Sequence, residues 1–534
     1  MPFAFPRKGE GGKGRVSKFF SYIMNKMNLL GCMGILALTA TLGSCSSNDD
    51  PTPNPTPDVA YKWTTNEGLK ACDHLLFGED GKDNAEGTVI GNGDQQLVFN
   101  GKQTLKKGVY TLKGWVYICD GAELTIEPGT VIKGDKTTKA ALIVERGGKL
   151  IAQGTADAPI VFTSAQAAGQ RRPGDWGGVI ICGKAKNNQN EMQIEGGPRT
   201  KHGGNDDADN SGVLSFVRIE FGGFPFKADQ EINGLTLGSV GSGTKIDHVQ
   251  VSYSNDDSFE WFGGAVNCKY LVAYKSWDDD FDTDNGFSGK VQFGLSVRDP
   301  KIADQSQSNG FESDNCADGA QVPPYTTATF SNITFVGPKS AADFKNESSY
   351  ITAGNYFPNN GSGLGKFQAA MQIRRSSRLN CVNSVVTDWP IGLIVDGEKG
   401  NTPAQAEAGN LRLQNIFIAN TDILGSDANK CYEDKEYDYK NKAVKADSKQ
   451  SYSHTFFEKQ AGNRYLADKS SLLLTDGKGV GVPFMPQAGS ALFGAQSFTG
   501  LDSWFTQVTY IGAFTTNDNW LDGWTNFDPQ NTVY

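Results

Sequence analysis

The chain has 534 residues, of which 64 are glycine, and its formal net charge at pH 7 is −10. This acidic balance argues against a nucleic-acid-binding surface, which needs clustered lysine and arginine, and a single short apolar segment excludes a polytopic membrane protein. A glycine share well above the usual value of about 7%, together with 31 phenylalanines, indicates many turns and favours an all-β protein.

The N-terminal region contains an apolar run from Leu29 to Leu42, preceded by Lys26. The run is too short to be a comfortable membrane span. It ends in Leu-Gly-Ser followed by Cys45, which resembles the lipobox of bacterial lipoproteins. That resemblance implies that residues 1–44 are a leader and signal peptide, that Cys45 is lipidated, and that the mature chain is anchored in outer-membrane lipid. In the alternative, the run is an ordinary secretory signal and Cys45 is incidental.

Residues 45–58 are polar and punctuated by proline, with no apolar residue to bury. This composition predicts a semi-extended tether. Asp49 and Asp50, just behind the cysteine, resemble the surface-export signal of lipoproteins in the Bacteroidetes, which implies that the protein faces the cell exterior. The alternative is a solvated linker in a periplasmic protein.

Residues 111–424 contain short runs of alternating apolar residues, each closed by glycine or Pro-Gly, which is typical of short strands separated by tight turns. The central apolar residues of successive segments follow one another at steps of 24, 22 and 30 residues: Leu235, Phe259, Phe281 and Phe311. A later pair, Met371 and Leu393, is again 22 residues apart. A period near 22 residues with several short strands is typical of a solenoid.

This repeat resembles the right-handed parallel β-helix. The coil length indicates the class, whereas the handedness is implied by the resemblance. A propeller blade would need about 40 residues, and a β-sandwich would not keep such a register. Ladders are expected in a parallel β-helix: Phe259, Phe281 and Phe311 stacked inside, and Asp257, Asp279 and Asn309 stacked at a turn, where short polar side chains bond to local backbone.

Several longer motifs resemble a group of secreted β-helix proteins that are common in the Bacteroidetes and are often labelled lipoprotein or "multidrug transporter". They occupy residues 174–185, 211–223, 254–274, 277–289 and 508–527. The resemblance covers roughly residues 110–534 and implies the fold and the location, but no settled activity. The transporter label conflicts with a sequence that shows no spanning segments.

Three regions lie outside the predicted coils. Residues 59–110 are expected to form an N-terminal cap, since an open β edge invites aggregation. Residues 425–465 are rich in charge and tyrosine and predict a surface insertion. Residues 466–534 predict a last coil and an aromatic C-terminal cap, with a sugar-stacking platform as the rival interpretation of their tryptophans.

Acidic residues are concentrated in the middle coils. If the phenylalanines face the core, Glu260, Asp282 and Glu312 face outward, because side chains alternate along a strand. Stacked coils are ~4.8 Å apart, and at that distance like charges repel by roughly 3 kcal/mol at an effective dielectric constant near 20. Calcium, which takes oxygen ligands, suits such a column. The candidate calcium ligands are Asp257, Glu260, Asp279, Asp280, Asp282, Asp284, Glu312 and Asp314. The alternatives are compensation by Lys275 or solvent, and partial protonation.

Two further candidate sites are weaker. The polar loop 203–212 carries Asp206, Asp207 and Asp209, and it could hold a second calcium ion, although such loops are common turns. A candidate ligand platform combines two aromatic and two basic side chains of the middle coils: Trp261, Trp277, Lys275 and Arg298.

Three functions of different classes are compatible with these features. The first is a non-enzymatic binding or adhesion solenoid at the cell surface, with a glycan as the candidate ligand, since no nucleophile–base pair is recognisable and no catalytic residue can be assigned. The second is a polysaccharide lyase or hydrolase. The third is a lipoprotein accessory to a TonB-dependent outer-membrane transporter. The fold cannot decide among them, because the same solenoid hosts all three.

Overall fold

The computed structural model describes residues 71–227, 230–357, 360–428 and 450–534, together with 437–438, 440–441 and 443–445. All of these residues belong to one compact unit. The predicted leader, the lipidation site Cys45 and the tether 45–58 lie outside the described residues. Among the helices that are described, none has the length and hydropathy needed to cross a bilayer.

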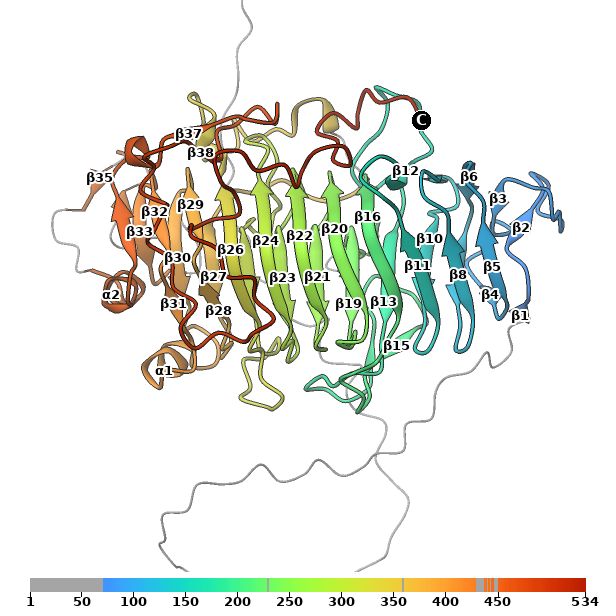
Figure 1. The fold of residues 1–534 in the computed structure, drawn as a ribbon, viewed down its shortest axis with the longest axis horizontal. Coiled ribbons are helices and arrows are strands. Elements are labelled where there is room, and N and C mark those ends of the chain that lie inside the picture. The colour runs from blue at the N-terminus through green and yellow to red at the C-terminus, as the bar shows by residue number, and fades with distance from the viewer. Residues whose placement is uncertain are drawn as a thin grey trace, which may run out of the picture. The chain divides into compact units, whose positions relative to one another are not determined.

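The described chain is a right-handed parallel β-helix, as predicted (Figure 1). One long side of each coil contributes a strand to a 12-stranded parallel sheet. Its strands are β1 (Ala71–Cys72), β4 (Leu97–Phe99), β7 (Trp115–Ile118), β10 (Ala141–Val144), β13 (Gly178–Cys182), β19 (Leu235–Gly238), β21 (Phe259–Phe262), β23 (Phe281–Asp284), β25 (Phe311–Ser313), β27 (Ala369–Ile373), β30 (Ile391–Val395) and β33 (Ile423–Ser426).

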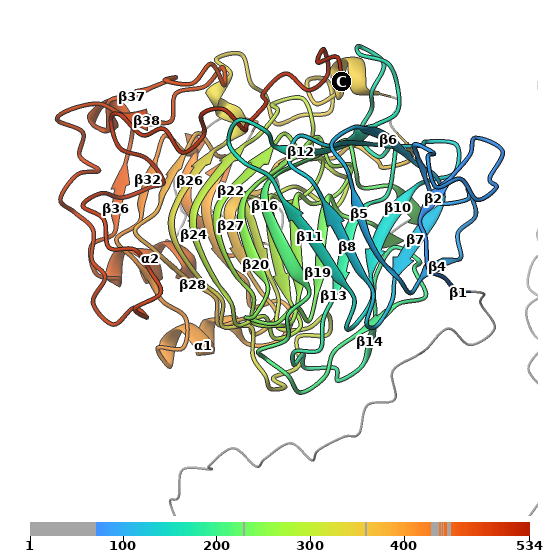
Figure 2. The ribbon, with the colours of Figure 1, turned by 45° about the vertical axis from the view of Figure 1, so that its right-hand side comes forward.

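The rest of each coil forms an 18-stranded sheet, and Figure 2 shows how its strands stack along the solenoid. Short strand pairs occur near both ends, whereas each middle coil has one long strand. The members are β2 (Leu76–Phe77), β3 (Val89–Ile90), β5 (Lys102–Leu105), β6 (Val109–Leu112), β8 (Glu123–Ile126), β9 (Val131–Gly134), β11 (Lys149–Gln153), β12 (Ile160–Ser164), β16 (Gly212–Glu220), β20 (Lys245–Ser252), β22 (Asn267–Tyr274), β24 (Lys290–Val297), β26 (Thr329–Val336), β28 (Asn380–Val382), β29 (Val385–Thr387), β31 (Leu413–Gln414), β32 (Phe417–Ala419) and β36 (Arg464–Leu466).

The predicted register of the coils is confirmed. Phe259 pairs with Phe281, and Phe281 with Phe311, in neighbouring parallel strands. The pairing continues from Phe311 to Met371 and on to Leu393. The three phenylalanines are fully buried, and their ring centroids are 5.7 and 5.9 Å apart along the stack. Like side chains therefore lie on like positions inside the solenoid.

Each long strand bends at one residue with a left-handed backbone. This residue has φ of 52° at Phe216, 51° at His248, 60° at Tyr270 and 64° at Phe293. The four rings stack outward from coil to coil, with centroids 4.3, 4.4 and 5.0 Å apart. The same position is asparagine in the later coils, at Asn332, Asn383 and Asn415, a residue type that tolerates this conformation. The bend thus builds an outer ladder along the 18-stranded sheet.

The C-terminal segment covers this ladder and does not form the end cap that we expected. Residues 497–534 run back along the side of the solenoid (Figure 1). Asn383 Nδ2 donates to the Ser497 carbonyl at 3.0 Å, and the ring centroid of Trp524 lies 5.7 Å from that of His248. The Tyr534 hydroxyl donates to Glu220 at 2.6 Å. We call residues 497–534 the strap. The aromatic residues that suggested an end cap instead pack against the side of the solenoid.

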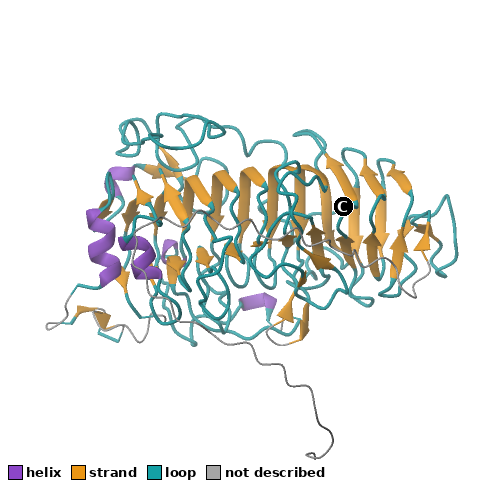
Figure 3. Cartoon of the chain, turned by 90° about the horizontal axis from the view of Figure 1, so that it is seen from below, coloured by secondary structure: helices purple, strands orange, loops and turns teal. Residues whose placement is uncertain are grey.

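The two ends of the solenoid also differ from expectation. Strands β4, β5 and β6 form a coil whose strands pair with those of the next, and β1 and β3 pair in parallel with β4 and β6, so the coils already extend into the region 59–110 that was assigned to a cap. At the other end, β33 and β36 continue the sheets across the two boundaries of the predicted insertion 425–465. Between them, α2 (Tyr452–Lys459) buries Phe456 and Phe457 and packs on β30 and β33. Figure 3 shows α2 and α1 (Thr402–Glu407) gathered at this end.

Small elements project from the coils. Among the described residues, two-stranded antiparallel pairs are formed by β14 (Met192–Gln193) with β15 (Lys201–His202), β17 (Pro225–Lys227) with β18 (Gln230–Glu231), β34 (Tyr437–Asp438) with β35 (Ala443–Val444), and β37 (Leu474–Thr475) with β38 (Met485–Pro486). The 3₁₀ turns in this described part are η1 (Pro338–Ser340), η2 (Gly354–Tyr356) and η4 (Ser470–Leu472). The loops around β14–β15 and β17–β18 matter below, because they bring two further acids to the site.

Candidate metal centre

A ladder of short polar side chains marks the turns that lead into β21, β23 and β25. The Asn233 side-chain oxygen accepts from the Asp257 backbone N–H at 3.1 Å, and Asp257 Oδ1 accepts from the Asp279 N–H at 2.7 Å. Asp279 accepts in turn from the Asn309 N–H, and Asn309 from the N–H of Ala369. The predicted stacking of Asp257, Asp279 and Asn309 is therefore confirmed, and each rung bonds to the backbone of the next coil.

A column of carboxylates lies on the outer side of the same strands. Glu260 pairs in register with Asp282, and Asp282 with Glu312. The column points away from the core, yet it is not a solvated face: Glu260 is only 7% exposed. Glu195, between β14 and β15, and Glu231 of β18 add negative charge to this face, where they act on the pKa of Glu260 and Asp256 respectively.

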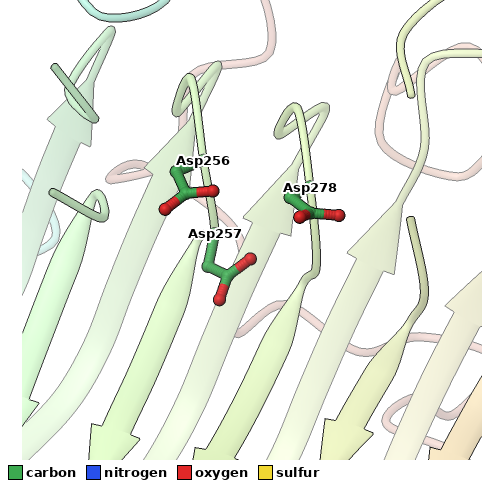
Figure 4. Close-up of side chains that lie close together, drawn as sticks. All are labelled: Asp256, Asp257 and Asp278. Atoms are coloured by element: carbon green, nitrogen blue, oxygen red, sulfur yellow. The ribbon is translucent and has the colours of Figure 1, made fainter. Parts of the chain in front are cut away.

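In the described part of the chain, three groups of carboxyl groups are close enough to share ions. Within each group the ligand atoms lie within 4.8 Å of one another. Site 1 is Asp256, Asp257 and Asp278, which Figure 4 shows at the turns of two neighbouring coils. Site 2 is Asp257, Glu260 and Asp282, and site 3 is Asp279, Asp282 and Glu312. Asp257 is common to sites 1 and 2, so the sites form a continuous chain across the coils.

Two buried oxygen atoms in these sites have no hydrogen-bond donor in the described part of the chain. They are Asp278 Oδ1 in site 1 and Asp282 Oδ1 in sites 2 and 3. A buried polar atom without a partner costs about 1–3 kcal/mol, and more for a charged group. A bound cation would satisfy both atoms. The donor set consists of carboxylate oxygens, which calcium prefers.

The protonation of these acids is strongly perturbed. Burial, followed by repulsion from neighbouring carboxylates, raises the pKa of Asp257, Glu260 and Asp282 well above the usual range. The same two causes raise the pKa of Asp256 and Asp278. Burial also raises the pKa of Asp279 and Asp284 to about 6, where backbone hydrogen bonds offset part of the effect. Ionising all these groups together therefore requires a compensating positive charge.

Other acids of the candidate set already have that charge from arginine. Arg298 Nη1 donates to Asp280 Oδ1 at 2.9 Å, and both side chains are fully buried. Arg374 pairs with Glu312 and, at 2.8 Å, with Asp314, which also pairs with Arg375 at 2.6 Å. Asp280 is not a member of any of the three sites. Lys275, the counter-charge considered from the sequence, is instead 3.9 Å from Asp299.

The predicted ligand platform is not present as a surface. Trp261, Trp277 and Arg298 are buried, so they cannot receive a ligand from solvent. Trp261 stacks on Phe287 with ring centroids 5.3 Å apart, and Trp277 Nε1 donates to the Gly363 carbonyl at 2.8 Å. The prediction was wrong because Trp261 shares the inward side with Phe259, and because a distant loop covers Trp277.

The loop 203–212 does not gather its acids. Asp207 pairs with Lys186 at 2.8 Å, Asp209 accepts from the Ser211 hydroxyl at 3.1 Å, and Asp206 accepts from the Ala208 N–H at 3.1 Å. The contacts of Asp206 and Asp209 are local turn contacts, whereas Asp207 forms an ion pair with a residue outside the loop. Within the described residues, the loop contributes to none of the three-carboxylate groups.

Four important residues were absent from the predicted set, although their spacing was visible. Asp256 and Asp278 are 22 residues apart and each directly precedes a ladder residue. Arg374 lies three residues after Met371, as Asp314 does after Phe311, so the register places the two side by side. Arg375 follows directly. Extending the repeat by one residue on either side would have found all four.

Comparison with known proteins agrees with this architecture. The family described as pectate-lyase-like β-helix domain matches residues 97–464. The chain therefore belongs to this family, whose match begins at the first strand of the coil formed by β4, β5 and β6. No similar curated protein and no similar solved structure was found.

Proposed function

We propose that this member of the pectate-lyase-like β-helix family is a calcium-binding solenoid that binds extended polysaccharide at the cell surface without cleaving it. The observation that carries the proposal is the row of carboxyl groups in sites 1 and 2, where buried oxygens of Asp278 and Asp282 lack a donor within the described chain. The family is compatible with both binding and polysaccharide chemistry, so the distinction depends on the site.

Calcium would be held between neighbouring coils. One ion would take oxygens from Asp256, Asp257 and Asp278, and a second from Asp257, Glu260 and Asp282. Calcium takes six to eight oxygen ligands, so positions remain for backbone carbonyls, water and sugar oxygens. Each ion would neutralise carboxylates that otherwise repel one another, and it would tie β21 to β23. Site 3 is less available, because its Glu312 is already paired with Arg374.

The location is part of the proposal and is supported by the sequence alone. Lipidation of Cys45 would anchor the mature chain in the outer membrane, and Asp49 with Asp50 would direct it to the cell exterior. A TonB-dependent transporter remains a candidate partner on the same grounds. Replacing Cys45 with alanine is expected to abolish labelling with a fatty-acid analogue, whereas equal labelling of the variant would contradict the anchor.

The binding proposal is tested with a glycan array of plant and microbial polysaccharides. We expect the protein to be retained on at least one polysaccharide in millimolar calcium. Its retention is expected to fall when a chelator is added or when Asp257 is replaced with asparagine. Asp257→Asn is a mild change, because the asparagine oxygen can keep the rung of the turn ladder, as Asn233 and Asn309 do. A wild-type chain that binds no polysaccharide in calcium would contradict the proposed function.

A calcium-dependent lyase is the second candidate, and Arg374 favours it. Its guanidinium lies beside site 3, where it pairs with Glu312 and, at 2.8 Å, with Asp314. In an elimination, a base removes the proton next to the sugar carboxylate, a carbon–carbon double bond forms, and the glycosidic oxygen leaves. Release of unsaturated ends from polyuronides by the wild type, and its loss in Arg374→Gln, would identify a lyase. Binding without such products supports the non-enzymatic function.

A further inference from the structure

A cavity of about 700 Å³ lies at the edge of the solenoid where the strap ends. Four segments meet there: residues 169–172, 299–301, 353–357 and 528–531. Figure 2 shows the C-terminal end of the chain above this edge. The volume is in the range of small-molecule sites in proteins. The cavity is separate from the carboxylate sites, whose residues do not line it.

The cavity has an aromatic wall. Phe357 lines it and is 51% exposed, which is unusual for a large apolar side chain in this chain. The neighbouring Tyr356 is held in place, because its ring centroid lies 4.9 Å from that of the buried Tyr253. An exposed ring next to a fixed one offers flat apolar area at little cost in side-chain freedom. Such a wall suits the apolar face that a pyranose ring presents through its C–H groups.

The charges around the cavity cancel. Arg172 and Lys301 contribute two positive charges, and Asp299 and Asp528 contribute two negative charges. The lining therefore offers both donors and acceptors without a net charge, in contrast to the acidic face of the 12-stranded sheet. A ligand that both donates and accepts hydrogen bonds but carries no charge, such as a sugar with free hydroxyl groups, matches this lining.

An unused acceptor lies in the same lining. Gln530 Oε1 is buried and has no hydrogen-bond donor in the part of the chain that the structure describes. The backbone around it is fixed, since the Gln530 carbonyl accepts from the Gly169 N–H at 2.7 Å. Beside it, the Asn531 amide donates to Asp528 at 2.8 Å. A hydroxyl group of a ligand would satisfy Gln530, whereas an apolar ligand would leave it unpaired.

We propose that this cavity binds a short stretch of neutral oligosaccharide, with a sugar ring packed on Phe357 and hydroxyl groups bonded to Gln530 and the charged rim. The proposal deepens the proposed function and rests on it, because it adds a second polysaccharide contact at the strap to the calcium-dependent contact at sites 1 and 2. Binding at the cavity is independent of sites 1 and 2.

The test is isothermal titration calorimetry of the full chain with cellohexaose, mannohexaose and xylohexaose, and with hexagalacturonic acid as the charged comparator. At least one neutral hexaose is expected to bind, and Phe357→Ala is expected to weaken its affinity at least tenfold. Phe357→Tyr keeps the ring and should retain binding within about threefold. The matched control is Leu473→Ala, which trims another exposed apolar side chain, 44% exposed and not part of the cavity lining, and should have no effect.

The outcomes separate the two proposals. If glycans bind the wild type and Phe357→Ala equally well, the cavity is not the site and the proposed function stands. If only the charged comparator binds, the assignment to a neutral ligand is overturned. If no glycan of any class binds in calcium, the cavity and the proposed function both fail. If Asp257→Asn still binds the neutral sugar, binding at the cavity does not require the calcium sites.

Discussion

Two groups of acidic residues in the middle coils differ in whether an arginine balances their charge. Asp280, Glu312 and Asp314 are each paired with arginine, in contacts that include the fully buried Arg298. Asp256, Asp257, Glu260, Asp278 and Asp282 form no ion pair with lysine or arginine in the described chain, although they lie on the same turns and strands. The chain thus supplies its own cations where negative charge is structural. Where it does not, we propose that the carboxylates share a cation from solution.

Removing the arginine partner of a buried acid gives the largest expected loss of unfolding free energy. Arg298→Met leaves Asp280 buried without its partner, and loss of one member of a buried pair costs about 3–5 kcal/mol of unfolding free energy. Chemical denaturation should show this loss with and without calcium. Adding Asp280→Asn to Arg298→Met should recover part of the stability, and a single variant as stable as the wild type would contradict the importance of the pair.

The unpaired group should instead respond to calcium. Millimolar calcium is expected to raise the melting temperature by several degrees, because a ligand at about 100 times its Kd stabilises the native state by about 2.7 kcal/mol. Asp282→Asn should remove most of that gain. Asp206→Asn, at a residue that makes a turn contact and belongs to none of the three sites, is the matched control and should keep the gain. A chelator that leaves wild-type melting unchanged would mean that the carboxylates are not a calcium site.

The buried acids should also make the stability of the protein depend on pH. In calcium-free protein, burial raises the pKa of Asp279 and Asp284 to about 6, and burial also raises the pKa of Asp282 well above its usual range. The folded state then binds more protons than the unfolded state, so stability falls as pH rises through and above the range from about 4 to 6. The melting temperature in chelator should therefore be higher at pH 5 than at pH 8. Calcium should reduce this difference, and a melting temperature that rises with pH in chelator would be inconsistent with it.

The smallest effect concerns the boundary between the groups. Arg374 occupies the place of a cation beside Glu312, so replacing it with glutamine frees the third carboxylate group. Native mass spectrometry should count two calcium ions on the wild type and three on Arg374→Gln. If Arg374→Gln binds the same number of calcium ions as the wild type, Arg374 is not what keeps calcium out of site 3.

The fold was predicted mainly from the sequence repeat. A step near 22 residues placed Phe259, Phe281 and Phe311 in the core and Asp257 with Asp279 on the turn, because parallel coils repeat the environment of each position. The same alternation places Trp261 inside, so its proposed role as a platform contradicted the pattern itself. The repeat also held Asp256, Asp278 and Arg374 in register, one to three residues from positions that were recognised.

Contacts between distant segments could not be read from the repeat. The strap meets the outer ladder at Asn383 and His248, 114 and 276 residues from its partners Ser497 and Trp524, and no period links them. The cover over Trp277 comes from Gly363, 86 residues away. Local patterns predict which side of a strand a residue faces, whereas burial of an outer side depends on which loop lies over it.

Direct calcium binding tests the central claim. Isothermal titration calorimetry of the chelator-stripped full chain at pH 7.5 should show saturable binding of two calcium ions. Asp257→Asn should lose most of the binding, because Asp257 contributes to both sites, and Asp206→Asn should bind as the wild type does. The account is contradicted if the wild type binds no calcium at millimolar concentration, or if Asp257→Asn binds two ions with unchanged affinity.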